Sequence, residues 1–340
     1  MNFWQRPYLA ARAGIFPKPD KPTPETDIMN IKKISALPKT VAVAGVLLAS
    51  AFVNLNAQIV ANFSDGTGSS LPDQYVGAAG DGWARSWYSL TSSGNISISG
   101  ALDDSKPLND GGKYLQVTTS QTGGGGSQQN TSLGRKYTTY GSVDTSKAHI
   151  ISFDLRIDSW AIGSTNPGSQ FIGIYGNTTA NMGNNFTSTS SWMIRVFAGA
   201  SGNASAQTWA AYDGARDGSA YSTSNLQDIG SGLTLQLGVT YSFTIINDPT
   251  TGSYKVTITD GETTVSTDGW LGYRTSNWGE NYDDDLWTVW HQQTLNINDG
   301  AKFSVDNISI AAVPEAGSLS LVGVVLVGSV CLKRLQRKSR

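Results

Sequence analysis

Aromatic side chains are concentrated in one short stretch of the chain, and their chemistry suits sugar binding. Six tryptophan and tyrosine residues fall within twenty-one positions: Trp270, Tyr273, Trp278, Tyr282, Trp287 and Trp290. Flat aromatic faces stack on the C–H faces of sugar rings, and nearby amide and carboxylate groups bond the hydroxyls. Glycines between positions 269 and 279 predict a loop there, where binding residues tend to lie. The candidate glycan-binding residues are therefore Trp270, Tyr273, Trp278 and Tyr282.

Burial in a β-sheet core is the alternative for these aromatic residues. Tryptophan is highly buried on average, and the cores of β-sandwiches readily hold it. Trp287 and Trp290 fall in a predicted strand, 286–291, and at least one of them should face inward. The loop aromatics are therefore the stronger candidates for ligand contact.

Groups for acid–base or metal chemistry are scarce in the same region. Glycoside hydrolysis normally needs two carboxyl groups flanking the scissile bond, yet residues 58–312 contain only two glutamates, Glu262 and Glu280. The two histidines, His149 and His291, are isolated from each other and from any cysteine, so they do not form a zinc motif. No Gly-x-Ser-x-Gly segment lies between a predicted strand and a helix. We therefore expect no catalytic residues.

The elements that would hold these groups are β-strands. Ile151, Phe153, Leu155 and Ile157 alternate with polar residues, which is the period of a half-buried strand. The same alternation runs through 233–237 and 241–245, and Asp260-Gly261 predicts a hairpin between two β-branched runs. Shorter strands are predicted at 95–99, 114–118, 170–175, 192–197, 286–291 and 303–310. No segment has a capped helical period, so the fold class is all-β, a single β-sandwich of jelly-roll or concanavalin-like arrangement.

The last predicted strand changes its parity part-way along. Phe303 and Val305 share one parity, whereas Ile308 and Ile310 share the other. A β-bulge near Asp306-Asn307 would place all four apolar side chains on the core face.

Charge is distributed unevenly along the chain. The whole chain has 24 basic and 26 acidic residues, but residues 58–312 alone have 12 basic and 22 acidic, a net charge of −10. Such an acidic domain argues against a nucleic-acid partner and is compatible with a polysaccharide. The single cysteine, Cys331, lies in the C-terminal apolar run, so no disulfide can form within 58–312.

The N-terminal region has the layout of a secretory signal peptide. From Met29 a basic segment precedes an apolar run at 41–53, and Leu55-Asn56-Ala57 forms a small-residue cleavage site before Gln58. We expect a signal helix within 29–57 and cleavage between Ala57 and Gln58, with the proline-containing residues 1–28 as an upstream extension. The alternative is an uncleaved anchor, but the apolar run is shorter than the ~20 residues that a spanning helix needs.

The C-terminal tail, residues 313–340, has three parts. Val313-Pro314-Glu315 precedes an apolar run from 319 to 332, and a basic cluster closes the chain. The cluster comprises Lys333, Arg334, Arg337, Lys338 and Arg340. Basic residues resist crossing a bilayer, so the apolar run predicts a short transmembrane helix with a cytoplasmic end.

This tail resembles the PEP-CTERM sorting signal of Gram-negative bacteria, although Ala316 replaces the second proline. The resemblance implies export through the Sec machinery and a transient stay in the inner membrane. It also implies processing by an exosortase near the motif, and delivery to the cell surface or extracellular matrix.

The terminal strands of the domain 58–312 resemble the bracketing strands of jelly-roll carbohydrate-binding modules. In several such families an acidic residue near the last strand helps to hold a structural calcium ion. Carried over, this makes Asp306 a candidate ligand and Asp65 its partner, with no other cofactor implied. The alternative is that Asp306 bonds neighbouring backbone at the bulge. Two further acidic groups, at 103–110 and 280–285, lack the alternating ligand spacing of an EF-hand loop.

Two functions follow from these observations. The first is a non-catalytic structural or adhesive protein of the cell surface or matrix that binds polysaccharide. The alternative is a secreted carbohydrate-active enzyme, a glycoside hydrolase or polysaccharide lyase, on a concanavalin-like fold. A passive matrix protein without any glycan affinity is a third reading.

Overall fold

The computed structural model describes eleven parts of the chain. They are residues 58–63, 83, 87–91, 96–121, 129–137, 143–163, 166–177, 190–214, 225–274, 286–293 and 300–313. The predicted signal helix, the apolar run of the tail and the basic cluster lie outside these parts. Among the described residues, no helix has the length and apolar character needed to span a membrane.

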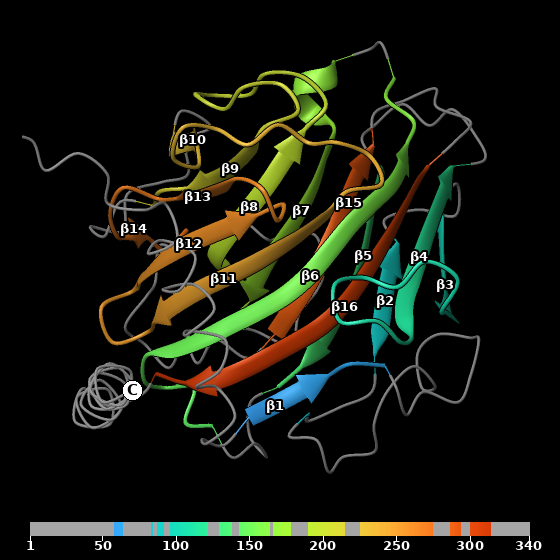
Figure 1. The fold of residues 1–340 in the computed structure, drawn as a ribbon. Helices are drawn as coiled ribbons and strands as arrows, with labels where there is room; N and C mark the ends of the chain where they lie inside the picture. The colour runs from blue at the N-terminus through green and yellow to red at the C-terminus, as the bar shows by residue number, and fades with distance from the viewer. Residues whose placement is uncertain are drawn as a thin grey trace, which may run out of the picture. The chain divides into compact units, whose positions relative to one another are not determined.

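The described part is all-β, as predicted, and forms two antiparallel sheets (Figure 1). Apart from strands it contains one short 3₁₀ turn, η2 (Pro167–Ser169). The first sheet, sheet A, has nine described strands. In spatial order seven of them are β13 (Thr264–Ser266), β12 (Ser253–Thr259), β11 (Thr240–Asp248), β6 (His149–Trp160), β16 (Ala301–Ala312), β4 (Tyr114–Gln121) and β3 (Ile96–Asp103). The other two are β1 (Gln58–Ala61), which pairs with β16, and β14 (Leu271–Gly272), which pairs with β12.

The second sheet, sheet B, has seven described strands and lies behind sheet A in Figure 1. Its spatial order is β10 (Leu226–Asp228), β9 (Trp209–Tyr212), β8 (Ser190–Phe197), β7 (Phe171–Asn177), β15 (Leu286–Gln293), β5 (Gln129–Lys136) and β2 (Tyr88–Thr91). The chain therefore passes between the sheets several times, which is the arrangement of a β-sandwich.

The core lies between the sheets and uses the predicted alternation. On β6, the side chains of Ile151, Phe153, Leu155 and Ile157 are all buried. Phe153 stacks on Phe243 of β11 with 4.7 Å between ring centroids. Across the sandwich, Phe153 meets Trp287 of β15 at 5.5 Å. Trp287 is thus the inward-facing tryptophan that the sequence predicted.

The predicted bulge in the last strand is confirmed. The register of β16 against β6 shifts between Asp306 and Ser309, and Asn307 takes a positive φ of 52°. As a result Phe303, Val305, Ile308 and Ile310 are all buried in the core. The bulge reverses the parity of the strand, which leaves the Asp306 side chain on the outer face of sheet A, beside Asp154.

One local prediction needs correction, and a second is confirmed. The segment 233–237 is not a full strand: Leu233 and Leu235 are buried, but Leu237 is exposed and begins a turn, and the pairing is a single bridge between Thr234 and Thr208. Positive φ angles at Gly232 and Gly238 interrupt extended structure on both sides. The Asp260-Gly261 hairpin does form between β12 and β13, but through a four-residue loop in which the Asp260 carboxylate accepts bonds from two backbone amides.

Candidate functional site

The outer face of sheet A is crossed by the β3–β4 loop, residues 104–113, which we call the strap (Figure 1). Arg156 of β6 donates from Nη1 to the Lys106 carbonyl at 2.8 Å. Further along the strap, Asn109 Nδ2 donates to Asp154 of β6 at 3.1 Å and to Ser242 of β11 at 2.7 Å. These bonds join the strap to strands that are distant from β3 and β4 in the sheet order.

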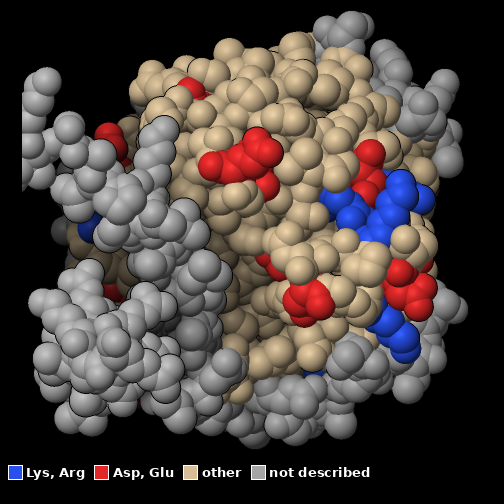
Figure 2. Space-filling view, viewed as in Figure 1, with Lys and Arg blue, Asp and Glu red and all other residues tan. Residues whose placement is uncertain are grey.

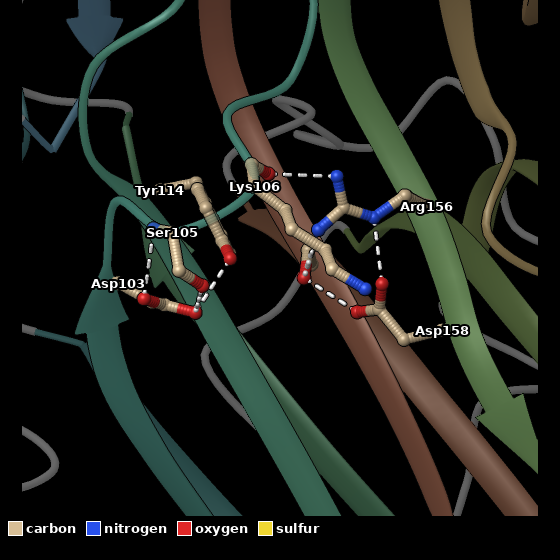
Figure 3. Close-up of polar contacts among 7 residues, drawn as sticks. Asp103, Ser105, Lys106, Tyr114, Arg156 and Asp158 are labelled. Atoms are coloured by element: carbon tan, nitrogen blue, oxygen red, sulfur yellow. Dashed lines mark hydrogen bonds and ion pairs between the residues drawn. The ribbon is translucent and has the colours of Figure 1, made fainter.

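Figure 3 shows the polar network that anchors the start of the strap. Arg156 Nε donates to Asp158 at 2.6 Å, and its guanidinium lies 5.3 Å from the Tyr114 ring centroid. The Tyr114 hydroxyl donates to Asp103 at 2.6 Å. This bond, with those from Ser105, lowers the pKa of Asp103 to about 2. The carboxylates of Asp103 and Asp158 and the Arg156 guanidinium all have partners, so the network is a structural anchor.

Three carboxyl groups gather at the middle of the strap: Asp110 belongs to the strap, and Asp154 and Asp306 belong to the sheet beneath it. Asp306 is buried, and its Oδ1 accepts the Asn307 backbone N–H at 2.8 Å, which confirms the predicted backbone bond at the bulge. Its Oδ2 has no hydrogen-bond partner. Burial, followed by the charges of Asp110 and Asp154, raises the pKa of Asp306 to about 8. Asp306 is therefore largely protonated at neutral pH in the structure as it stands.

The predicted calcium site matches this cluster only in part. A buried carboxylate with an unpartnered oxygen suits a hard cation. However, Asp154 already accepts bonds from Asn109, Asn307 and Ser242. Within the described parts of the chain, no three acidic, histidine or cysteine side chains are grouped to hold a metal. Asp65 lies outside the described residues, so calcium binding at Asp65 and Asp306 stays a prediction.

Two of the four candidate glycan-binding residues are described, and they differ in exposure. Trp270 is 40% exposed, and the Lys255 ammonium lies 5.3 Å from its ring centroid, on the outer side of β12. Tyr273 is buried, and its hydroxyl donates to Asn247 at 2.7 Å, so its ring cannot stack on a sugar in this conformation. Trp278 and Tyr282 lie outside the described residues. Figure 2, viewed from the sheet A side, shows separate acidic patches, with basic groups gathered towards one edge.

Of the predicted signal-cleavage site and the sorting motif, the structure describes one residue each, Gln58 and Val313. Gln58, the residue after the predicted cleavage point, begins β1 and pairs with Ala311 of β16. Val313 follows β16 directly and is 37% exposed. Ala57, Pro314, Glu315 and the basic cluster lie outside the described residues.

The outer face of sheet B holds a set of side chains that the sequence analysis missed. On β7, β15 and β8, the residues that alternate with the core positions are aromatic, cationic or very small. One row across the sheet contains Arg195, Gly173, Trp290 and Ser132 in register on β8, β7, β15 and β5. The next row contains Met193, Tyr175, Thr288 and Gly134. The row on the other side contains Phe197, Phe171 and Gln292. We call these three rows the aromatic face.

Contacts within the aromatic face are close. The Arg195 guanidinium lies 4.0 Å from the Phe171 ring centroid. The Trp290 ring lies 5.9 Å from Tyr175 and 6.3 Å from Phe171, centroid to centroid. Gly173 has no side chain, and the Arg195 and Phe171 side chains occupy the space beside it. A Cβ at Gly173 would stand 3.2 Å from Arg195 Cγ.

A second guanidinium, that of Arg274, adjoins the same face. Arg274 follows β14, and its Nη1 lies 3.1 Å from Met193 Sδ. Its guanidinium also lies 5.2 Å from the Tyr212 ring centroid. Burial raises the pKa of Tyr175 well above its usual range, although the positive charges of Arg195 and Arg274 oppose the shift. The Tyr175 hydroxyl therefore keeps its proton at neutral pH and can donate a hydrogen bond.

Catalytic groups are not placed on the described part of the aromatic face. One carboxylate aligns with it, Asp228 on the edge strand β10, in register with Ala210 and engaged by Ser205. His291 faces the core, where its Nδ1 lies 2.7 Å from Thr119 Oγ1, and burial lowers its pKa to about 3. His149 is also buried, with Nδ1 2.8 Å from the Lys147 carbonyl. Neither histidine is placed for acid–base work on the aromatic face.

Comparison with known proteins identifies similar structures. One is the family 11 carbohydrate-binding module of a Clostridium thermocellum cellulase, with 10% identity, a TM-score of 0.30, and coverage of 76% of this chain and 96% of that one. A winged bean acidic lectin has 10% identity, a TM-score of 0.35, and coverage of 66% and 97%. The GH131 β-glucanase catalytic domain of Podospora anserina has 10% identity, a TM-score of 0.41, and coverage of 64% and 79%.

No family model and no curated protein matches the sequence. With identities of 10% and TM-scores below 0.5, the function has to be argued from the residues of this chain.

Proposed function

We propose that this chain is a non-catalytic, polysaccharide-binding protein whose ligand face is the aromatic face of sheet B. The observation that carries the proposal is the row Arg195–Gly173–Trp290–Ser132, with Phe171 and Tyr175 on either side. The outward side of a sandwich sheet is ordinarily polar. Here it carries aromatic rings together with hydroxyl, amide and guanidinium groups that suit the hydroxyls of a sugar.

The burial of these side chains has a kinetic consequence. Trp290 is 5% exposed and Tyr175 is fully buried, so a ligand reaches the rings only if the protein rearranges around them. Binding should then include an opening step, and its observed rate should level off at high ligand concentration. Stopped-flow tryptophan fluorescence measures this directly.

The absence of acid–base groups on the described aromatic face supports binding over catalysis. Glycoside hydrolysis would need two carboxyl groups about 5–9.5 Å apart, and the described rows contain none. A lyase would need a base, and Tyr175 holds its proton firmly. The enzymatic alternative therefore has less support than simple binding.

The location of the protein is a further part of the proposal. The signal-like segment 29–57 and the tail 313–340 support export by the Sec machinery, exosortase processing and release to the cell surface or matrix. Mass spectrometry of the surface fraction should find a chain that begins at Gln58 and lacks the basic cluster. A full-length chain in the cytosol would contradict this location.

The test of binding uses the purified full chain and a panel of soluble polysaccharides. Affinity electrophoresis should retard the protein on at least one polysaccharide, with no new reducing or unsaturated ends released. Trp290→Ala should weaken this binding at least ~10-fold, as truncation of a buried aromatic anchor commonly does. Trp270→Ala is the matched control, because Trp270 lies beside Lys255 of sheet A. Equal binding by both variants, or release of products, would contradict the proposal.

A further inference from the structure

Strand β3, at one end of sheet A, lacks the features that keep strand edges from pairing with other chains. Proteins commonly protect such an edge with a very short strand, lysine, proline or a bulge. β3 has eight residues, contains neither lysine nor proline, and keeps an unbroken register against β4. Among the described strands it pairs with β4 alone (Figure 1).

The other described ends of the two sheets are shorter. In sheet A the end strand β13 has three residues. In sheet B the end strands β10 and β2 have three and four residues. Strand length therefore distinguishes β3 as the described end that offers a long run of backbone groups.

Side-chain burial indicates that β3 is accessible to solvent. Three of its outward side chains are exposed: Ser97, Ser99 and Ala101. On the inner face, Ile98 and Leu102 are only partly buried, whereas Leu115 of β4, which pairs with Leu102, is fully buried. The core is thus incompletely covered along β3, and one more strand beside it would bury further apolar surface.

We infer that β3 pairs in antiparallel fashion with β3 of a second copy of this chain, about a two-fold axis at Gly100. A glycine inside a strand often marks a site where another backbone approaches closely. Gly100 has a further interaction within its own chain, so the inference uses its position and not an open backbone group. The inference goes beyond the proposed function and does not depend on it.

Residues that face each other in this register are compatible. Ile98 lies opposite Leu102 of the second copy, and the symmetric pair repeats this contact, so both cores are extended at the same time. Ser99 lies opposite Ala101, which are two small side chains on the outer face. Cross-strand pairs of this kind are the unit that stabilises a sheet.

Charge is also compatible with a second copy as the partner. The single charged residue of β3 is Asp103, at its end, and the register places it opposite Ser97. The two Asp103 carboxylates stand three residues from the axis on either side, roughly 20 Å apart along the strands. Their repulsion is largely screened, since the Debye length is about 8 Å at physiological ionic strength.

The symmetry of the pairing limits the assembly to two chains. A two-fold interface uses the same surface of both copies and is closed. Once β3 is paired, the described ends that are left are the short strands β13, β10 and β2. Because residues 58–312 of each copy carry a net charge of −10, added salt should strengthen the association.

The test measures self-association of the purified full chain by sedimentation velocity, over a range of protein concentrations. We expect a reversible equilibrium between monomer and dimer. The double variant Ser99→Lys, Ala101→Lys places like charges directly opposite each other at two symmetric positions. It should lower the association constant at least ~10-fold.

Two matched variants show whether the effect depends on the register. Ser99→Asp with Ala101→Lys places opposite charges at the same two positions, so the association constant should stay within ~3-fold of the natural value. Thr264→Lys with Ser266→Lys adds the same charge at exposed positions of β13, at the other end of sheet A, and should leave association unchanged.

Three results would overturn the inference. One is a natural chain that stays monomeric up to ~1 mM, a concentration at which even weak specific complexes form. Another is an equal loss of association in the β3 and β13 lysine variants. The third is loss of association in the variant with opposite charges, because only pairing about Gly100 brings those charges together.

Hydrogen exchange of the β3 amides in the natural chain gives a second readout that needs no variant. Protection that rises with protein concentration supports pairing between copies. Protection that is the same at every concentration means that the chain's own segments cover the edge, and it would overturn the inference. This measurement decides the question if a double variant fails to fold.

Discussion

The substitution Asp306→Asn should remove a stability loss that the folded protein suffers as the pH rises. Burial beside Asp110 and Asp154 raises the pKa of Asp306 to about 8, from an ordinary value of 3.8. Between these two values the folded state holds a proton that the unfolded state has released. Stability therefore falls as pH rises from about 4 to about 8, by at most about 1.4 kcal/mol per pH unit.

The expected size of the effect is smaller than the full shift implies. Relaxation and water penetration reduce the penalty for a buried charge, so we expect roughly 2–3 kcal/mol over the whole range. Asparagine has nearly the same shape and no titrating proton. At pH 5 the variant should match the natural protein in free energy of unfolding, and at pH 9 it should be about 2 kcal/mol more stable.

Urea denaturation at pH 5, 7 and 9, in the presence of EDTA, measures this difference. Asp104→Asn is the matched control, because it removes a negative charge from the exposed start of the strap. The reasoning about Asp306 is refuted if the natural protein and Asp306→Asn show the same pH dependence. Replacing EDTA with calcium tests the predicted metal site, since a bound ion would stabilise the natural protein at pH 8 and leave the variant unchanged.

Three further outcomes follow from the structure. Arg156→Met should destabilise the fold by about 3 kcal/mol in urea denaturation, because it removes the donor to the Lys106 carbonyl and the cation beside Asp158, which keeps only its bond from Ser304. A loss below about 0.5 kcal/mol would contradict the anchoring role of Arg156. Gly300→Ala should prevent folding, since its Cβ would stand 1.6 Å from the Thr119 carbonyl oxygen. The control Gly269→Ala should be neutral, because its Cβ meets nothing within 4 Å. Circular dichroism compares the folding of the two variants. Tyr114→Phe should cost about 1 kcal/mol through loss of its bond to Asp103, and an unchanged midpoint of thermal unfolding would contradict it.

Local patterns predicted the strands well, for a physical reason. Alternation such as that of Ile151 to Ile157 reports burial on one face, and one-sided burial needs no knowledge of the partner strand. The bulge at Asp306-Asn307 was predictable because a change of parity within an apolar strand has few other solutions. The alternation rule gave a wrong strand at 233–237, because Gly232 and Gly238 have positive φ angles that end an extended segment whatever its pattern of apolar residues.

The aromatic face was not predictable in this way. Its rows depend on the register of β7 with β15, strands more than a hundred residues apart in sequence. No local pattern places Gly173 beside Trp290. One sequence signal was available: residues 192–197 are apolar at both odd and even positions, except for Arg195. In the structure the whole strand Ser190–Phe197 is buried. A strand that is apolar on both faces must be covered on both, and a cation within it points to a site.

The most direct test of the ligand face is an experimental structure of the full chain with an oligosaccharide of a polysaccharide that it binds. We predict sugar rings stacked against Trp290 or Tyr175. A sugar bound at Trp270, or anywhere on sheet A with the aromatic face closed, would contradict the account.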